Sequence, residues 1–298
     1  MAERFHPDLK RARRMSRQAV SPATLRPYRA LLSLGGALTG RGVEKADGPT
    51  GQPIWVYRPT VDGPHPALLW IHGGGLVFGH PLTERRFATD VRDELGALVA
   101  CPTYRFAPEH PYPAALDDAY AALTWLAEQP GVDPDRIAVG GDSAGGGLAA
   151  ALAIRARDRG GPKIAFQLLH EPMLDEATRH APPPAPDTLR LWSHGINRWA
   201  WDGYLSGVEG DVPATASPAR LTDASGLPPA WIGVGTRDLF HGEATAYAAR
   251  LRDAGIATEL HEVDGAYHGF VQTEGSAPVA RDYVARMKAA LERAWHVT

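Results

Sequence analysis

Residues 137–145 read Ile137-Ala138-Val139-Gly140-Gly141-Asp142-Ser143-Ala144-Gly145. The first five residues predict a short buried strand, and the alanine-rich stretch that follows predicts a helix to about Asp158. A glycine-x-serine-x-glycine sequence at such a strand-to-helix turn pushes the serine side chain outward, because the flanking glycines relieve crowding there. The stretch therefore predicts an α/β fold in which Ser143 is a nucleophile at the end of a strand.

Short apolar segments of the same kind lie on both sides of this turn. Strands are expected at 54–57, 67–72, 98–104, 164–169, 231–235 and 258–263, and helices at 114–128 and 279–295, with further helices between the strands. This alternation indicates a mostly parallel sheet covered by helices on both faces. Such sheets bind ligands at the carboxyl ends of their strands, which is where Ser143 is expected.

Two stretches interrupt the alternation. Residues 1–40 are expected to be helical and rich in arginine, with a break at Gly35-Gly36, and a proline cluster begins at Pro182. We interpret 1–45 as the N-terminal part of a helical cap and 46–298 as the main domain, with a cap insertion at about 182–208, because long segments of this kind are often lids. An ordinary pair of surface helices is the alternative. The tryptophans of the insertion could line a substrate pocket or form the core of the cap.

Composition excludes several classes of protein. The chain has 298 residues, is 44% hydrophobic and has a net charge of -3, which is typical of a folded domain and does not favour nucleic acid or an anionic membrane as a partner. Its single cysteine, Cys101, cannot form an internal disulfide or a CxxC zinc site. No run reaches the ~18 apolar residues of a membrane span, and the segment after the basic start is too polar for a signal peptide. We therefore expect a soluble, cytoplasmic protein without metal or cofactor.

A second glycine-rich sequence follows the strand expected at 67–72. It reads His72-Gly73-Gly74-Gly75, and consecutive glycines let backbone N–H groups approach a substrate oxygen without side chains in the way. The N–H of Ala144, at the positive end of the helix after Ser143, can donate to the same oxygen. The sequence thus predicts an oxyanion hole built from Gly73, Gly74, Gly75 and Ala144.

A serine hydroxyl needs a base, and histidine is the usual one. His268 follows the strand expected at 258–263, and Asp238 follows the strand expected at 231–235, so loops at one edge of the sheet can bring both to Ser143. Asp264 is the rival acid, but we expect it to be too close to His268 in sequence to reach around to the imidazole. His170-Glu171 lacks the second histidine of a zinc motif and is interpreted as structural.

With these motifs in order, the chain from about residue 50 onward resembles the hormone-sensitive-lipase-like esterases, also called bacterial family IV. The resemblance rests on His72-Gly73-Gly74-Gly75, on 104–115, on Gly141-Asp142-Ser143-Ala144-Gly145-Gly146, on Pro172-Met173-Leu174-Asp175, on 226–230, on Asp238-Leu239-Phe240 and on His268-Gly269-Phe270. Two departures stand out. Many members have Asp-Pro-Leu where this chain has Asp238-Leu239-Phe240. Glu171 stands where an aromatic or aliphatic residue is expected, and its carboxylate could lie near the site or point elsewhere.

The resemblance implies an α/β-hydrolase fold with a helical cap and a catalytic triad of Ser143, Asp238 and His268. It implies that Gly74, Gly75 and Ala144 donate to the oxyanion, that Gly73 supports the turn, and that His72 is structural. It also implies hydrolysis of small-molecule carboxylic esters with short to medium acyl chains, no cofactor, and a possible homodimer. The same triad could serve an amidase, a lactonase or a carbamate hydrolase. A non-catalytic receptor on this fold is disfavoured because all three triad residues are present.

Overall fold

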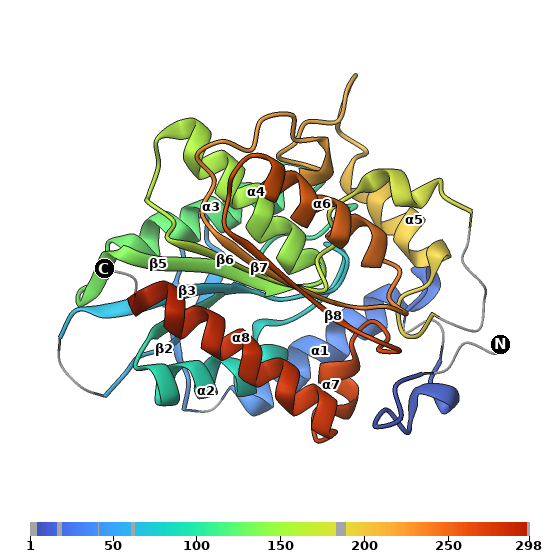
Figure 1. Ribbon diagram of the computed structural model, residues 1–298, viewed down its shortest axis with the longest axis horizontal. Helices are drawn as coiled ribbons and strands as arrows, with labels where there is room; N and C mark the ends of the chain where they lie inside the picture. The colour runs from blue at the N-terminus through green and yellow to red at the C-terminus, as the bar shows by residue number, and fades with distance from the viewer. Residues whose placement is uncertain (1–4, 17–19, 41, 61–62, 183–188, 297–298) are drawn as a thin grey trace.

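The computed structural model describes residues 5–16, 20–40, 42–60, 63–182 and 189–296. A sheet of eight strands forms the centre of this part of the chain (Figure 1). In spatial order the strands are β1 (Glu44–Asp47), β2 (Pro53–Tyr57), β4 (Leu98–Pro102), β3 (His65–Ile71), β5 (Val132–Asp142), β6 (Phe166–His170), β7 (Ala230–Gly235) and β8 (Thr258–Val263). From β4 to β8 neighbouring strands run parallel, whereas β1 and β2 pair antiparallel at one edge. The predicted mostly parallel sheet is confirmed.

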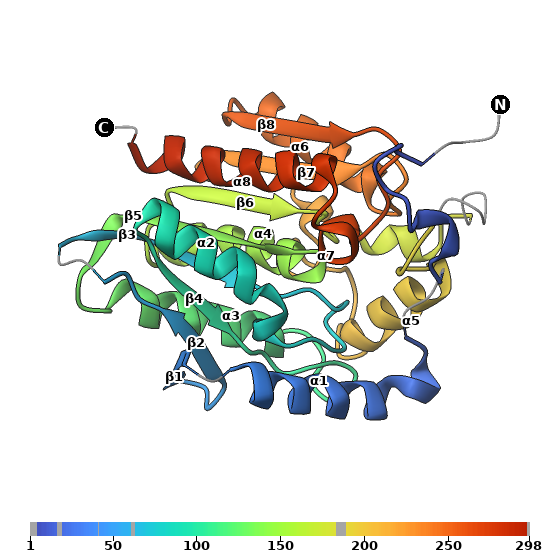
Figure 2. The same cartoon turned by 90° about the horizontal axis from the view of Figure 1, so that it is seen from below.

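Helices cover both faces of this sheet, as Figures 1 and 2 show. One face carries α3 (Ala114–Ala127), α4 (Ala144–Arg159) and α6 (His241–Asp253), and the other carries α2 (Arg85–Leu95) and α8 (Pro278–His296). Side chains of β3 alternate between the two layers: Leu69 packs into the first core, and Leu68 and Trp70 pack into the second. The near-continuous apolar run of β3 follows from burial on both faces.

The predicted break at Gly35-Gly36 is wrong, because α1 (Leu25–Thr39) continues through both glycines. Glycine is a poor helix former, yet a Cβ at Gly36 would lie 2.4 Å from Cε1 of His80. Glycine therefore permits the close approach of α1 to His80, and packing outweighs its weak helix propensity.

The segments interpreted as a cap lie near one another. Helix α5 (His194–Tyr204) lies beyond the carboxyl ends of the strands (Figure 2), and the N–H of Leu191 donates to the carbonyl of Ser16 at 3.0 Å. Residues 183–188 of the expected insertion lie outside the described part of the chain. Within the described part, no helix is both long and apolar enough to cross a membrane.

Candidate active site

Ser143 lies in the turn between β5 and α4, in a conformation that few residues adopt. Its φ is 55° and its ψ is -117°, and its N–H donates to the carbonyl of His170 at 2.8 Å. The turn packs tightly on the end of β3, since a Cβ at Gly145 would lie 2.0 Å from the carbonyl oxygen of Ile71. Strain of this kind persists only where the surrounding structure enforces it. The two glycines of the motif thus allow a turn that fixes the position of the serine hydroxyl.

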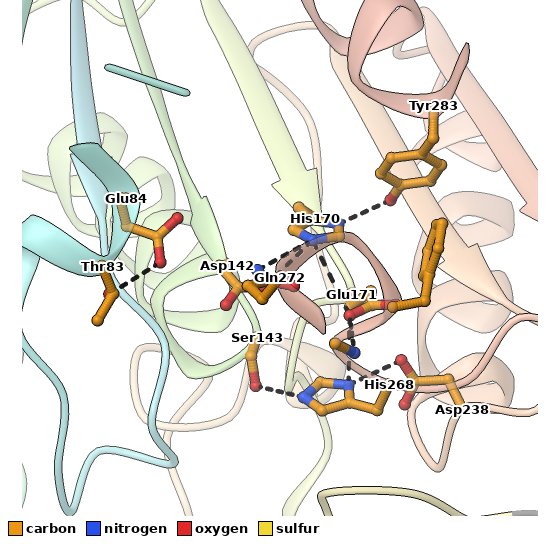
Figure 3. A network of polar contacts seen from close by, with 12 residues as sticks. Thr83, Glu84, Asp142, Ser143, His170, Glu171, Asp238, His268, Gln272 and Tyr283 are labelled. Atoms are coloured by element: carbon orange, nitrogen blue, oxygen red, sulfur yellow. Dashed lines mark hydrogen bonds and ion pairs between the residues drawn. The ribbon is translucent and has the colours of Figure 1, made fainter. Parts of the chain in front are cut away.

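The three residues predicted as the triad lie together (Figure 3). Ser143 follows β5, Asp238 follows β7, and His268 precedes α7 (Phe270–Glu274) in the loop after β8. Nε2 of His268 is 3.0 Å from Oγ of Ser143, and Nδ1 of His268 is 2.8 Å from Oδ2 of Asp238. All three are buried, with exposed fractions of 4% for Ser143, 7% for Asp238 and 8% for His268.

The carboxylate of Asp238 determines which nitrogen of His268 carries the proton. An ionised carboxylate can only accept, so Nδ1–H donates to Asp238 and Nε2 is left to accept the hydroxyl proton of Ser143. Burial alone would lower the pKa of His268, but the charge and hydrogen bond of Asp238 outweigh it and raise that pKa. The arrangement therefore stabilises the imidazolium that forms when Nε2 takes a proton.

The rival acid is not directed at the histidine. Asp264 accepts a hydrogen bond from the hydroxyl of Thr236 at 3.1 Å on the exposed surface of the loop. His72 also lies as expected for a structural residue: Nδ1 is 2.8 Å from the carbonyl of Gly73, and the ring stacks on Tyr104 with centroids 4.4 Å apart.

Of the glycines predicted for the oxyanion hole, Gly73 lies directly against Ser143, and Gly74 and Gly75 follow it in the same loop. A Cβ at Gly73 would lie 3.3 Å from Cβ of Ser143, which places this backbone against the nucleophile. Gly74 and Gly75 have φ values of 118° and 61°, in the region that favours glycine. Ala144 is the first residue of α4 and is buried beside the same loop. The predicted residues are thus brought together by the ends of β3 and β5.

The sequence-based prediction that Gly74 donates to an oxyanion can be tested by replacing it with alanine, which should lower kcat by about 10²–10³-fold, the usual effect of losing one such donor. The new Cβ would lie 2.0 Å from the carbonyl oxygen of Phe78, so the loop must shift. Gly242→Ala is the control, because nothing lies within 4 Å of its added Cβ. Steady-state kinetics with a chromogenic ester would measure the change. Equal activity of the two variants would contradict a role for this loop.

The segment directly before α5, which contains Trp192, lies over the site. The indole of Trp192 lies 6.5 Å, centroid to centroid, from the His268 ring, and its N–H donates to Asn197 at 3.1 Å. A Cβ at Gly75 would lie 2.1 Å from this indole, so Trp192 packs directly on the glycine loop. Trp192 therefore lies beside both the glycine loop and His268.

A second polar cluster, not predicted as part of the site, lies behind the triad. Nε2 of His170 is 3.3 Å from Oδ1 of Asp142 and 3.9 Å from Oε2 of Glu171, and Nδ1 of His170 is 2.8 Å from the hydroxyl of Tyr283 (Figure 3). Burial raises the pKa of Asp142 to about 8 and lowers that of His170 to about 3. These groups are thus held largely uncharged. The sequence signal is Glu171, a charged residue directly after an apolar strand, whose carboxylate could lie near the site or point elsewhere.

Within the described part of the chain, two sets of three side chains have potential metal ligand atoms within 4.8 Å of one another: Asp142, His170 and Glu171, and Glu171, Asp238 and His268. In the second set, a metal on His268 would displace the hydrogen bond that orients the base. The first set shares Glu171, whose Oε2 already accepts the N–H of Gly269 at 2.6 Å. In each set at least one ligand atom is thus already engaged in a hydrogen bond within the protein.

Comparison with known proteins gives consistent matches. A family described as having the alpha/beta hydrolase fold matches residues 68–272. The carboxylesterase NlhH of Mycobacterium tuberculosis is 39% identical over 264 residues, which cover 84% of this chain and 81% of NlhH. The crystal structure of esterase LipW from Mycobacterium marinum superposes with a TM-score of 0.86 at 33% identity, covering 98% of this chain and 96% of LipW. A bacterial heroin esterase gives a TM-score of 0.85 at 36% identity, covering 98% of each chain.

Proposed function

The chain is a member of the α/β-hydrolase family, as its resemblance to the hormone-sensitive-lipase-like esterases predicts, and we propose that it is a carboxylesterase with Ser143, His268 and Asp238 as its catalytic triad. The observation that carries this proposal is the hydrogen-bonded series from Oγ of Ser143 through the imidazole to Asp238, at 3.0 and 2.8 Å. The names of NlhH and LipW support the ester as the bond that is cleaved.

In the proposed acylation step, Oγ of Ser143 attacks the ester carbonyl while Nε2 of His268 takes the hydroxyl proton. Backbone N–H groups of Gly74, Gly75 and Ala144 stabilise the oxyanion, and Gly73 supports their turn. His268 then gives the proton to the departing alcohol, which leaves an acyl group on Ser143. Asp238 keeps the imidazole in the required tautomer and stabilises its charged form.

In the proposed deacylation step, His268 takes a proton from water, and the resulting hydroxide equivalent attacks the acyl carbonyl. The second tetrahedral intermediate collapses when Nε2 returns the proton to Oγ of Ser143, and the carboxylic acid leaves. No group outside the chain is consumed except ester and water, so the residues of the triad return to their starting state.

The size of the acyl group is suggested by a narrow apolar pocket beside the nucleophile turn. It is lined by Leu76, Ala144, Gly147, Leu148, Ala151, Met173, Trp201, Tyr204 and Ala216. Trp201 and Tyr204 come from α5 and are each only 1% exposed, so bulky side chains close the pocket. This supports esters with short to medium acyl chains, and it supports the segment at about 182–208 as part of a cap over the site.

Hydrolysis of 4-nitrophenyl esters from acetate to palmitate tests the proposal. We expect kcat/KM to be highest for the short chains and to fall steadily toward palmitate, because Trp201 and Tyr204 leave no space for a long acyl chain. An anilide with the same short acyl group is the control that separates esterase from amidase activity. A maximum at palmitate would refute the proposed chain length, and faster turnover of the anilide would refute the ester as the preferred bond.

A further inference from the structure

Glu171 is a buried carboxyl group beside the catalytic histidine that the triad mechanism does not use. Its side chain has an exposed fraction of 0%, and Oε2 lies 3.7 Å from Nδ1 of His268 (Figure 3). The same oxygen accepts the N–H of Gly269 at 2.6 Å. Among the described residues, Oε1 has no hydrogen-bond partner. Burying a carboxyl group with one oxygen unpaired costs free energy, so the presence of Glu171 at this position requires an explanation.

The backbone directs this side chain toward the histidine. Glu171 follows β6 with a φ of 45°, a left-handed conformation that is uncommon for glutamate. Its N–H donates to the carbonyl of Gly233 on the neighbouring strand β7 at 2.8 Å. The strained residue is therefore fixed by the sheet, and its carboxyl group lies between β6 and the loop that carries His268 (Figure 3).

The two carboxyl groups that face Nδ1 of His268 are not equivalent. Asp238 is 2.8 Å from Nδ1 and also accepts the N–H of Phe240 at 2.9 Å, so it has two donors. Glu171 has the single donor Gly269 on Oε2. Burial raises the pKa of Glu171 well above its usual value, and the charge of Asp238 raises it further. Glu171 is therefore held neutral beside Asp238.

We propose that Glu171 is a positioning residue for His268, which anchors the histidine loop through Gly269 and provides a second carboxyl group that can hold Nδ1–H when Asp238 is lost. Removing the charge of Asp238 also removes a cause that keeps Glu171 neutral. Burial, the larger cause, remains, so Glu171 is the carboxyl group left beside His268 and can accept Nδ1–H as a neutral acid from its position 3.7 Å away. This inference rests on the proposed function, because it concerns the base of the same reaction.

A double-mutant cycle of Asp238→Asn and Glu171→Gln tests the proposal. Glu171→Gln keeps an acceptor for Gly269, so alone it should change kcat/KM by less than about 10-fold. Asp238→Asn alone should lose about 10²-fold, and the double variant should lose about 10⁴-fold, the usual effect of an unsupported histidine tautomer. Glu262→Gln, at an exposed pair with His241, is the control and should have no effect in either background.

The Nδ1-bound proton of His268, observed by NMR, gives a second readout that does not depend on turnover. We expect the signal to persist in the wild type and in Asp238→Asn and to be lost in the double variant. Retention of the signal in the double variant, or losses in kcat/KM that simply multiply, would overturn the role of Glu171. If the wild type hydrolyses no ester, the proposed function fails, but the NMR comparison still decides whether Glu171 holds the imidazole.

Discussion

Ser143→Ala should lower kcat for short-chain ester hydrolysis by about 10⁶-fold, as loss of the nucleophile does in other serine hydrolases. The substitution removes Oγ, which lies 3.0 Å from Nε2 of His268, and no acyl-enzyme can form. Alanine fits the turn in size, although Ser143 has a φ of 55° that is strained for either residue. The fold should therefore survive while the chemistry is lost. Initial rates for 4-nitrophenyl acetate over several enzyme concentrations would measure the difference.

The matched control for this variant is Ser206→Ala. Ser206 is exposed, whereas Ser143 is buried, and the hydroxyl of Ser206 donates to the carbonyl of Gly203 at 3.0 Å. Its removal should leave kcat unchanged. Circular dichroism of both variants would establish that each is folded. Turnover by Ser143→Ala within about 10-fold of the wild type would mean that another group is the nucleophile.

His268→Ala should lower kcat by a similar factor, on the order of 10⁶, because the serine hydroxyl is a weak nucleophile without its base. The ring is 8% exposed and packs edge-on against Phe240 with centroids 5.1 Å apart. The substitution therefore also leaves a space beside Phe240. Thermal unfolding should be measured with the kinetics, so that a loss of stability is not mistaken for a loss of catalysis.

A variant that carries both Ser143→Ala and His268→Ala tests whether the two residues act as one unit or contribute to catalysis independently. Residues that act as one unit show losses that do not multiply, so Ser143→Ala with His268→Ala should be no slower than either single variant. His110→Ala, at an exposed histidine, is the control for the histidine substitution. A double variant that is far slower than both singles would contradict the coupling of Ser143 to His268.

The sequence predicted the turn at Ser143 and the buried strands well, because a glycine in a tight turn and a continuous apolar run each have a single physical explanation. The turn at Ser143 requires small neighbours, and a Cβ at Gly145 would indeed collide with the carbonyl of Ile71. The buried strands have continuous apolar residues because both faces are covered. Their order then brings Asp238 and His268 to the same edge as Ser143.

The features that the sequence patterns did not predict depend on contacts between distant parts of the chain. Strand β1 is polar and mostly exposed, so it has no apolar pattern, and its existence follows from pairing with β2. Helix α1 passes through Gly36 because His80 packs against it. The sequence leaves open whether Glu171 lies near the site, because its closeness to His268 depends on the positions of β6 and the loop after β8, which are separated by nearly a hundred residues.

Labelling with a fluorophosphonate, followed by peptide mass spectrometry, is the most direct test of the central claim that Ser143 is the activated nucleophile. The account predicts one phosphonyl group per chain, on the peptide that contains Ser143, with loss of ester hydrolysis in proportion to labelling. The Ser143→Ala variant should not be labelled. A label on another residue, or a fully labelled protein that still hydrolyses esters at the original rate, would contradict the assignment of Ser143, His268 and Asp238 as the catalytic triad.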